Sequence, residues 1–133
     1  MRWGRIAAVL AVAGAVGLVG SCESGPTEPR PGALDLVFAP PAPGTGALLF
    51  VVDGAPIDSV EPAGYGTISG RLSASAVRVI VTGPLVPGPV ARLRVPDVRL
   101  ARQYRATLEE VADGATYGLR DTAGYRLAVA VPR

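Results

Sequence analysis

The chain of 133 residues contains no lysine, no histidine and no asparagine, and its only cysteine is Cys22. Histidine is the most common general base in enzymes and the most common metal ligand in proteins, so its absence removes both roles. The absence of lysine excludes a Schiff base, and a single cysteine excludes a disulfide within the chain. We therefore expect a protein that is not an enzyme and that uses no cofactor.

The amino-terminal segment has the arrangement of a secretory signal. Arg2 and Arg5 precede an apolar run of 15 residues, 6–20. This run is short for a membrane span, which needs about 20 residues, but it suits the apolar region of a cleaved signal peptide. The run ends in Val19-Gly20-Ser21-Cys22, and the whole pattern resembles the signal of bacterial lipoproteins.

The lipoprotein resemblance implies that residues 1–21 are a signal-peptide helix that is removed, and that Cys22 becomes the lipidated first residue of the mature protein. Several acyl chains on Cys22 would hold the protein firmly in a membrane. Glu23 stands where an aspartate would retain such a protein at the inner membrane. The resemblance thus implies an outer-membrane location, facing the periplasm or the cell surface. An uncleaved amino-terminal anchor is the alternative.

Residues 22–32 comprise the lipidated amino terminus and a linker. Residues 23–32 contain three prolines, two glycines and no apolar side chain of any size. Such a segment cannot bury a hydrophobic face, so we expect it to be flexible. Its expected role is that of a tether, which holds residues 33–131 away from the lipid surface.

Removal of the signal changes the charge of the chain. The full sequence has a formal charge of +2, but Arg2 and Arg5 lie in the signal, and the remaining 11 arginines match the 11 acidic residues. A neutral mature chain has no electrostatic basis for binding nucleic acid. The 112 residues that follow the signal suffice for one domain.

From residue 33 onward, short apolar runs alternate with glycine and proline, which is the pattern of an all-β sandwich or barrel. Residues 47–52 are apolar at every position, as in a central strand. Residues 125–131 alternate most clearly, with Leu127 and Val129 on the apolar face. The other expected strands cover residues 33–38, 56–60, 65–72, 77–82, 91–95, 104–111 and 115–120, and a loop is expected at 83–89.

The segment 98–111 fits both a helix and a strand. Asp97 is a suitable helix N-cap, and apolar residues recur at helical spacing after it, whereas residues 104–108 also alternate as in a strand. We divide the segment into a helical turn at 98–103 and a strand at 104–111, followed by a hairpin turn at Asp113-Gly114. The result is about nine strands in roughly 100 residues, the size of an immunoglobulin-like sandwich.

The order of these segments is similar to that of the cohesin-like β-sandwich domains over residues 33–131. The segments that carry the similarity are an opening pair at 46–52 and 57–60, a middle hairpin at 76–85 and 91–95, and closing strands at 104–111 and 125–131. Cohesins bind protein modules called dockerins, and relatives of the fold bind carbohydrate. The resemblance therefore implies a binding module, but no family binding residue has a counterpart that can be identified here.

Three groups of residues are candidates for a binding site. Arg92 and Arg94 belong to an arginine-rich stretch that could bind an anion; the alternative is a solvated strand face balanced by neighbouring acids. Asp53 and Asp58 are candidate calcium ligands, or carboxylates that cap turns. Tyr65 and Tyr117 lie on glycine-flanked segments and could stack on a sugar, whereas Tyr104 and Tyr125 are expected in the core.

These observations favour a membrane-anchored, non-catalytic binding module for a protein or a polysaccharide. A structural envelope lipoprotein without a soluble ligand is the first alternative. A small hydrolase that uses a carboxylate pair is the second, and the missing acid–base groups argue against it.

Overall fold

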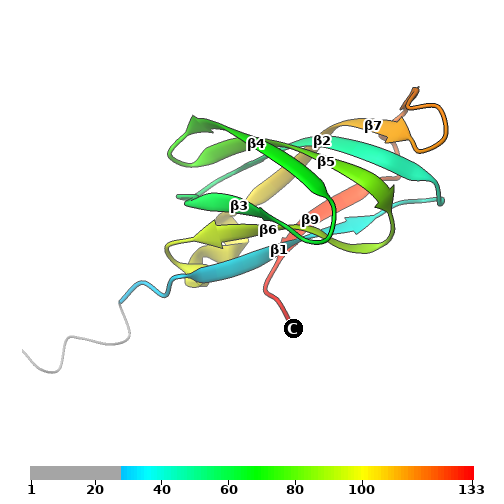
Figure 1. Ribbon diagram of the computed structural model, residues 1–133. Helices are drawn as coiled ribbons and strands as arrows, with labels where there is room; N and C mark the ends of the chain where they lie inside the picture. Colours follow the sequence, from blue (N-terminus) through cyan, green and yellow to red (C-terminus); the bar gives the residue numbers. More distant parts are fainter. Residues whose placement is uncertain (1–27) are drawn as a thin grey trace, which may run out of the picture.

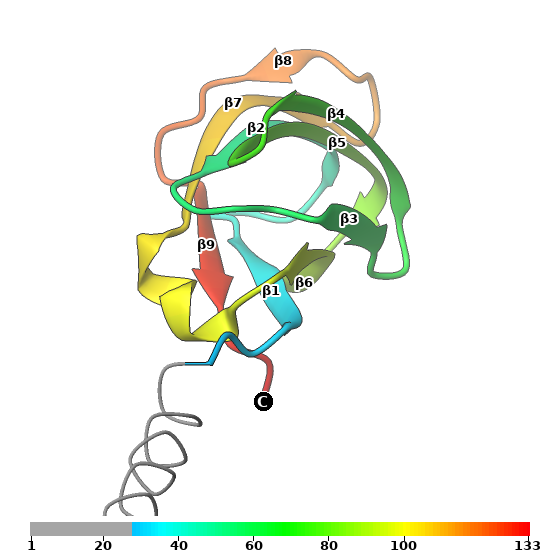
Figure 2. The same ribbon diagram turned by 90° about the vertical axis from the view of Figure 1, so that its left-hand side faces the viewer.

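The computed structural model describes residues 28–133, so Cys22 and the expected signal peptide lie outside the described residues. The described chain forms nine β-strands and one short 3₁₀-helix (Figure 1). The strands make two antiparallel sheets that pack face to face, as Figure 2 shows. This confirms the all-β class and the nine strands expected from the sequence. Between residues 28 and 133, no helix is long and apolar enough to cross a membrane.

The sheets contain four and five strands. The first has the order β3-β6-β1-β9, made of β3 (Ser59–Pro62), β6 (Gly88–Val95), β1 (Gly32–Ala39) and β9 (Arg126–Ala130). The second has the order β4-β5-β2-β7-β8, made of β4 (Gly66–Ser73), β5 (Ala76–Leu85), β2 (Thr45–Asp53), β7 (Arg105–Asp113) and β8 (Leu119–Arg120). The chain crosses between the sheets repeatedly, so neither sheet is a continuous stretch of sequence.

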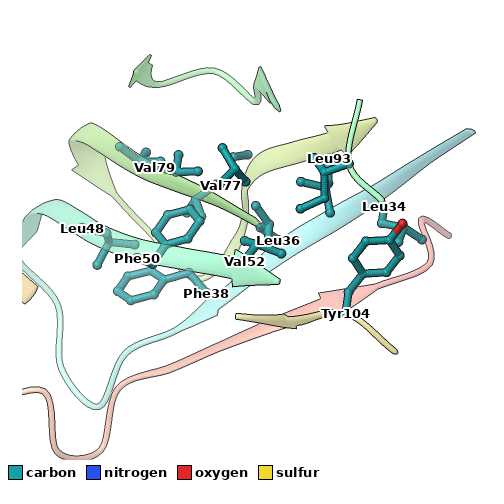
Figure 3. Close-up of a cluster of buried hydrophobic side chains, with 14 of the residues drawn as sticks. Leu34, Leu36, Phe38, Leu48, Phe50, Val52, Val77, Val79, Leu93 and Tyr104 are labelled. Carbon is teal, nitrogen blue, oxygen red and sulfur yellow. The ribbon is translucent and has the colours of Figure 1, made fainter. Parts of the chain in front are cut away.

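The core fills the space between the sheets (Figure 3). Every second residue of a strand points to the same face, which is why Leu34, Leu36 and Phe38 of β1 are all buried. Leu48, Phe50 and Val52 of β2 meet them from the other sheet. Burial of such a side chain stabilises a fold by about 1.5–3 kcal/mol, so this alternation is the main source of stability.

The central position predicted for residues 47–52 is confirmed, because β2 lies between β5 and β7. Only one of its faces is in the core, however. Leu49 and Val51 point to the outer face of the sheet and are half-buried there. The apolar run therefore predicted the central position of β2 correctly, although only one face of the strand is buried in the core.

The division of segment 98–111 is confirmed. Val98–Gln103 forms the 3₁₀-helix η2, and β7 follows at Arg105. Asp97 caps η2 by accepting a hydrogen bond from the Arg99 N–H at 3.0 Å. Tyr104 is buried between these elements, as expected, and its hydroxyl donates to the Pro56 carbonyl oxygen.

Three expected boundaries were wrong. The loop expected at 83–89 is shorter, because β5 continues to Leu85 and β6 begins at Gly88; Gly83 stays within β5 with a φ of 141°. The strand expected at 56–60 begins only at Ser59, because the preceding residues cross between the sheets. The return strand expected at 115–120 is reduced to β8, because residues 114–118 form a turn.

The faces of the last strand agree with the sequence. Leu127 and Val129 of β9 are half-buried and pack against the core. Tyr125, just before β9, stacks on Phe38 with ring centroids 6.1 Å apart. Because β9 has one hydrogen-bonded neighbour in its sheet, these side chains are less enclosed than those of β1.

The incoming chain and three of the connections between strands lie at opposite ends of the sandwich. At the end where β1 begins, Arg30 accepts a hydrogen bond from the Val98 N–H at 2.8 Å, and its own N–H donates to Asp97 Oδ1 at 3.3 Å. Three connections meet at the opposite end: β1–β2, β5–β6 and β7–β8 (Figure 1). The chain upstream of the sandwich thus joins it at one end, and the three connections lie at the other.

Candidate functional site: a cleft at the end of the sandwich

An open cleft of about 710 Å³ lies among these three connections. Residues 40–46 contribute one part, residues 83–87 another, and Gly114 with Tyr117 the third. We call it the end cleft. Its volume is within the range of about 300–1,000 Å³ that is typical of ligand sites.

The lining of the end cleft is uncharged. Five of its 14 residues are proline and four are glycine, so much of its surface is exposed backbone and flat pyrrolidine rings. Tyr117 is the only aromatic residue among them, and none is an aspartate, a glutamate or an arginine. The sequence feature that marks this surface is the proline-rich segment at residues 40–44, but prolines in such a run indicate only a break between strands.

Asp113 organises the β7–β8 loop that carries Tyr117. Its carboxylate accepts hydrogen bonds from the Ala115 N–H at 3.2 Å, from the Thr116 hydroxyl at 3.3 Å and from the Arg120 guanidinium at 2.9 Å. The Ala115 N–H is the main cause of a lowered pKa of Asp113, and the positive charge of Arg120 adds to it. The carboxylate is therefore ionised at neutral pH and holds the loop in one shape.

The backbone fixes the same loop from two further directions. The Tyr117 N–H donates to the Asp113 carbonyl oxygen at 2.8 Å, and the Gly114 N–H donates to the Gly44 carbonyl oxygen of the β1–β2 connection at 2.8 Å. Tyr117 has a φ of 58°, a left-handed conformation that is uncommon for a residue with a side chain. Its side chain is 61% exposed at the edge of the end cleft.

The two tyrosines proposed for sugar stacking have different environments. Tyr65 is partly buried against the core, and its ring lies close to Gly83, where a Cβ atom would be 3.0 Å from the ring. Its hydroxyl accepts a hydrogen bond from the Val86 N–H at 3.4 Å. Tyr65 therefore supports the β5–β6 wall of the end cleft from behind, while Tyr117 presents its ring to solvent.

Thr45 was not identified from the sequence. It lines the end cleft but is only 2% exposed, and within residues 28–133 its hydroxyl is the buried side-chain polar atom that lacks a hydrogen-bond partner. A buried hydroxyl without a partner costs free energy. Nothing in the strand pattern distinguishes Thr45 from an ordinary first residue of a strand, so only the folded structure could single it out.

Arg92 and Arg94, the candidates for anion binding, both have carboxylate partners on the outer face of the four-stranded sheet. Arg92 pairs with Asp35 of β1 at 3.2 Å, and Arg94 pairs with Glu61 of β3 at 2.8 Å. The hydrogen bond that Arg94 donates to the Glu61 carboxylate raises the pKa of Arg94. An anion would have to displace these carboxylates, so the anion-binding surface stays a prediction.

Asp53 and Asp58, the candidate calcium ligands, lie at the two ends of the segment that leads from β2 towards β3. The described residues contain no group of three or more histidine, cysteine or acidic side chains that could hold a metal ion. The Asp58 carbonyl oxygen accepts a hydrogen bond from Arg71 at 2.8 Å, which ties this segment to β4. The calcium site likewise stays a prediction.

A second surface is the outer face of the five-stranded sheet. Ile68, Ile80 and Leu119 are exposed there by 71%, 41% and 71%, and Ile80 faces both Ile68 and Leu49 across the strands. We call these four residues the apolar sheet face. A shallow depression of about 160 Å³ lies beside Leu119 and Leu49. Contiguous exposed apolar residues of this kind often mark an interaction surface.

Residues 28–133 therefore form a two-sheet antiparallel β-sandwich with an open cleft at one end. Comparison of the chain with protein-family models, with curated proteins and with solved structures found no match in any of the three.

Proposed function

We propose that the chain is a lipid-anchored protein of the bacterial cell envelope, whose β-sandwich is a non-catalytic binding module for a protein or a polysaccharide. In this proposal the sandwich is immunoglobulin-like and cohesin-like, Cys22 carries the lipid, and the outer membrane is its location. The end cleft is the binding site.

The position of the end cleft carries this proposal. Arg30 enters the sandwich beside η2, and the connections that line the end cleft lie at the other end of β1. A lipid on Cys22 would therefore attach the sandwich to the membrane through the end opposite the cleft. The ten peptide units from Cys22 to Gly32 reach at most about 35 Å, which is enough to clear the lipid headgroups.

The chemistry of the end cleft supports a binding role rather than catalysis. Its lining offers no carboxylate, and neither histidine nor lysine occurs in the chain. Proton transfer in hydrolysis needs a positioned acid or base, and none of the lining side chains is suited to that role. A hydrolase is accordingly the least supported of the three alternatives.

A structural lipoprotein without a soluble ligand is the second candidate, and the apolar sheet face favours it, because an exposed apolar sheet can pack against another envelope protein. The two candidates differ in the surface that matters. We would capture partners from solubilised envelope fractions with the full chain and with Tyr117→Gly and Leu119→Ser variants.

The binding-module proposal predicts that Tyr117→Gly abolishes capture and that Leu119→Ser leaves it intact. Loss of capture in Leu119→Ser alone would show that partners bind to the apolar sheet face and not to the end cleft. Equal capture by all three proteins would contradict a role for the end cleft.

A further inference from the structure

We infer that the end cleft binds an uncharged, hydroxyl-rich polymer, a neutral polysaccharide, with the Tyr117 ring as the stacking surface and the Thr45 hydroxyl as a polar anchor beneath it. This inference rests on the proposed function of the end cleft and specifies its ligand class. It follows from the charge of the lining, from its hydrogen-bonding groups and from the conformation of Tyr117.

The lining of the end cleft offers no charged side chain for ionic recognition. No acidic or basic side chain lines the end cleft, and the nearest pair behind the loop, Asp113 and Arg120, is joined at 2.9 Å. A charged ligand would lose its hydration without gaining a counter-charge, which is costly. An uncharged ligand avoids this cost.

The backbone of the lining has more hydrogen-bond acceptors than donors. Its five prolines have carbonyl oxygens but no N–H group. Three other lining residues already use their N–H groups within the fold: Val86 donates to the Tyr65 hydroxyl, Gly114 to Gly44, and Tyr117 to Asp113. A ligand that brings donors of its own therefore fits this lining.

Sugar hydroxyls meet this requirement, because each can donate and accept. A proline-rich peptide does not, since its prolines add acceptors to a surface that already has them in excess. The apolar parts of the lining, above all the proline rings and Val86, suit the C–H faces of a pyranose ring.

The backbone of Tyr117 points to selection for its side chain. A left-handed φ of 58° favours glycine, and the chain contains 17 glycines, one of them at the next position, Gly118. Backbone strain of this kind is typically retained at functional sites. The hydrogen bonds of Asp113 hold the strained loop, so the exposed ring is presented in a fixed orientation before any ligand arrives.

Thr45 supplies the second independent observation. Its hydroxyl is buried at the cleft lining without a partner among residues 28–133. A displacement of the lining that exposed this hydroxyl would let a ligand hydroxyl, or a water held by the ligand, satisfy it. The end cleft thus combines an apolar ring at its edge with an unsatisfied hydroxyl beneath its surface.

The test measures binding of the full chain, purified in detergent, to an immobilised panel of neutral polysaccharides: a glucan, a xylan and a galactomannan. Polygalacturonate and poly-L-proline are the charged and peptide contrasts. The variants are Tyr117→Gly, which relieves the strained backbone, Thr45→Val, which keeps the shape, and Leu119→Ser as a control outside the end cleft. Circular dichroism melts verify that each variant is folded.

We expect at least one neutral polysaccharide to bind, and we expect affinity to fall about tenfold or more in Tyr117→Gly. Thr45→Val should weaken the same binding, and Leu119→Ser should leave it unchanged. Absence of binding to every neutral polysaccharide, or binding that Tyr117→Gly does not weaken, would overturn the inference.

The inference and the proposed function can fail separately. Tyr117-dependent binding to poly-L-proline or to polygalacturonate would reject a neutral polysaccharide but keep the end cleft as a binding site. If no ligand on the panel and no envelope component binds in a Tyr117-dependent way, the proposed function fails as well.

Discussion

At the scale of single residues, Thr45 places a hydroxyl where the fold gives it no partner. We expect Thr45→Val to leave the free energy of unfolding unchanged or to raise it by up to about 1 kcal/mol, because the variant removes an unsatisfied polar atom and keeps the shape. Urea denaturation measures the difference.

Thr67 provides the matched control for this substitution. Its hydroxyl donates to the Tyr65 carbonyl oxygen at 3.1 Å, so Thr67→Val should lower the free energy of unfolding by about 0.5–1.5 kcal/mol. Equal destabilisation by both substitutions would show that the Thr45 hydroxyl has a stabilising partner in solution.

Arg92 and Arg94, two residues apart on β6, differ in how deeply their partner carboxylates are buried. The side chain of Asp35, the partner of Arg92, is only 13% exposed, whereas that of Glu61, the partner of Arg94, is 41% exposed. We expect Arg92→Ser to cost about 1–2 kcal/mol, because it leaves a largely buried carboxylate without its partner.

For Arg94→Ser we expect only a small loss of stability, since exposed ion pairs contribute little. Denaturant unfolding of the two variants side by side gives the ranking. A larger effect for Arg94→Ser would mean that burial of the partner carboxylate does not set the cost.

At the scale of elements, β9 closes one edge of the four-stranded sheet. Leu127 packs against the core from this strand, so Leu127→Asp should place a carboxylate in an apolar contact and cost about 3 kcal/mol or more. Ala128→Asp is the control, because Ala128 is on the exposed face of β9. If thermal melts show equal losses for both, the faces of β9 are assigned wrongly.

The 3₁₀-helix η2 is joined to the incoming chain by Asp97, whose carboxylate binds the guanidinium of Arg99 at 2.9 Å and the N–H of Arg30 at 3.3 Å. The bonds from Arg99 are the main cause that holds the pKa of Asp97 far below its ordinary value of 3.8. The ionised form therefore stabilises the folded state.

This contribution is fully present above pH 4 and is lost as the pH falls below that value towards the lower pKa of the folded state. We expect Asp97→Asn to lower the melting temperature at pH 7 and to make it fall less steeply between pH 5 and pH 2. Parallel pH profiles for the variant and the natural protein would contradict the role of Asp97.

The elements also show what the sequence could predict. Alternation placed β7 and β9 correctly because each strand buries one face, an apolar run marked the central strand β2, and the Asp97 cap marked the start of η2. The loop at 83–89 was predicted too long, because glycine and proline are read as breaks although Gly83 and Pro84 are accommodated within β5.

The candidate site was predictable only in part. Tyr117 and Tyr65 were chosen from the same local pattern, a glycine-flanked segment, but Tyr65 supports a wall of the end cleft, whereas Tyr117 is exposed at its edge. Thr45 and the proline-rich connection come together with Tyr117 only through the pairing of β2 with β5 and β7. Such long-range pairing is not encoded in any local spacing.

At the scale of the whole molecule, the proposal depends on the lipid anchor. We expect Cys22→Ala to abolish metabolic labelling with a fatty-acid analogue and to move the protein from the membrane to the soluble fraction, because the cysteine sulfur is the attachment atom. Unchanged labelling would reject the assignment, while labelled protein that stays at the inner membrane would reject only the location.

The position of β1 has a mechanical consequence. A pull between the incoming chain at Arg30 and a ligand in the end cleft runs along β1, which has β6 on one side and β9 on the other. The hydrogen bonds of antiparallel pairs are perpendicular to their strands. Tension along β1 therefore acts in shear on all its hydrogen bonds to β6 and β9 at once. A pull between Arg30 and the carboxyl terminus, which leave β1 and β9 at the same end, instead peels β9 from its single hydrogen-bonded neighbour, one bond after another. The direction of a force, as well as its size, therefore decides when the sandwich opens.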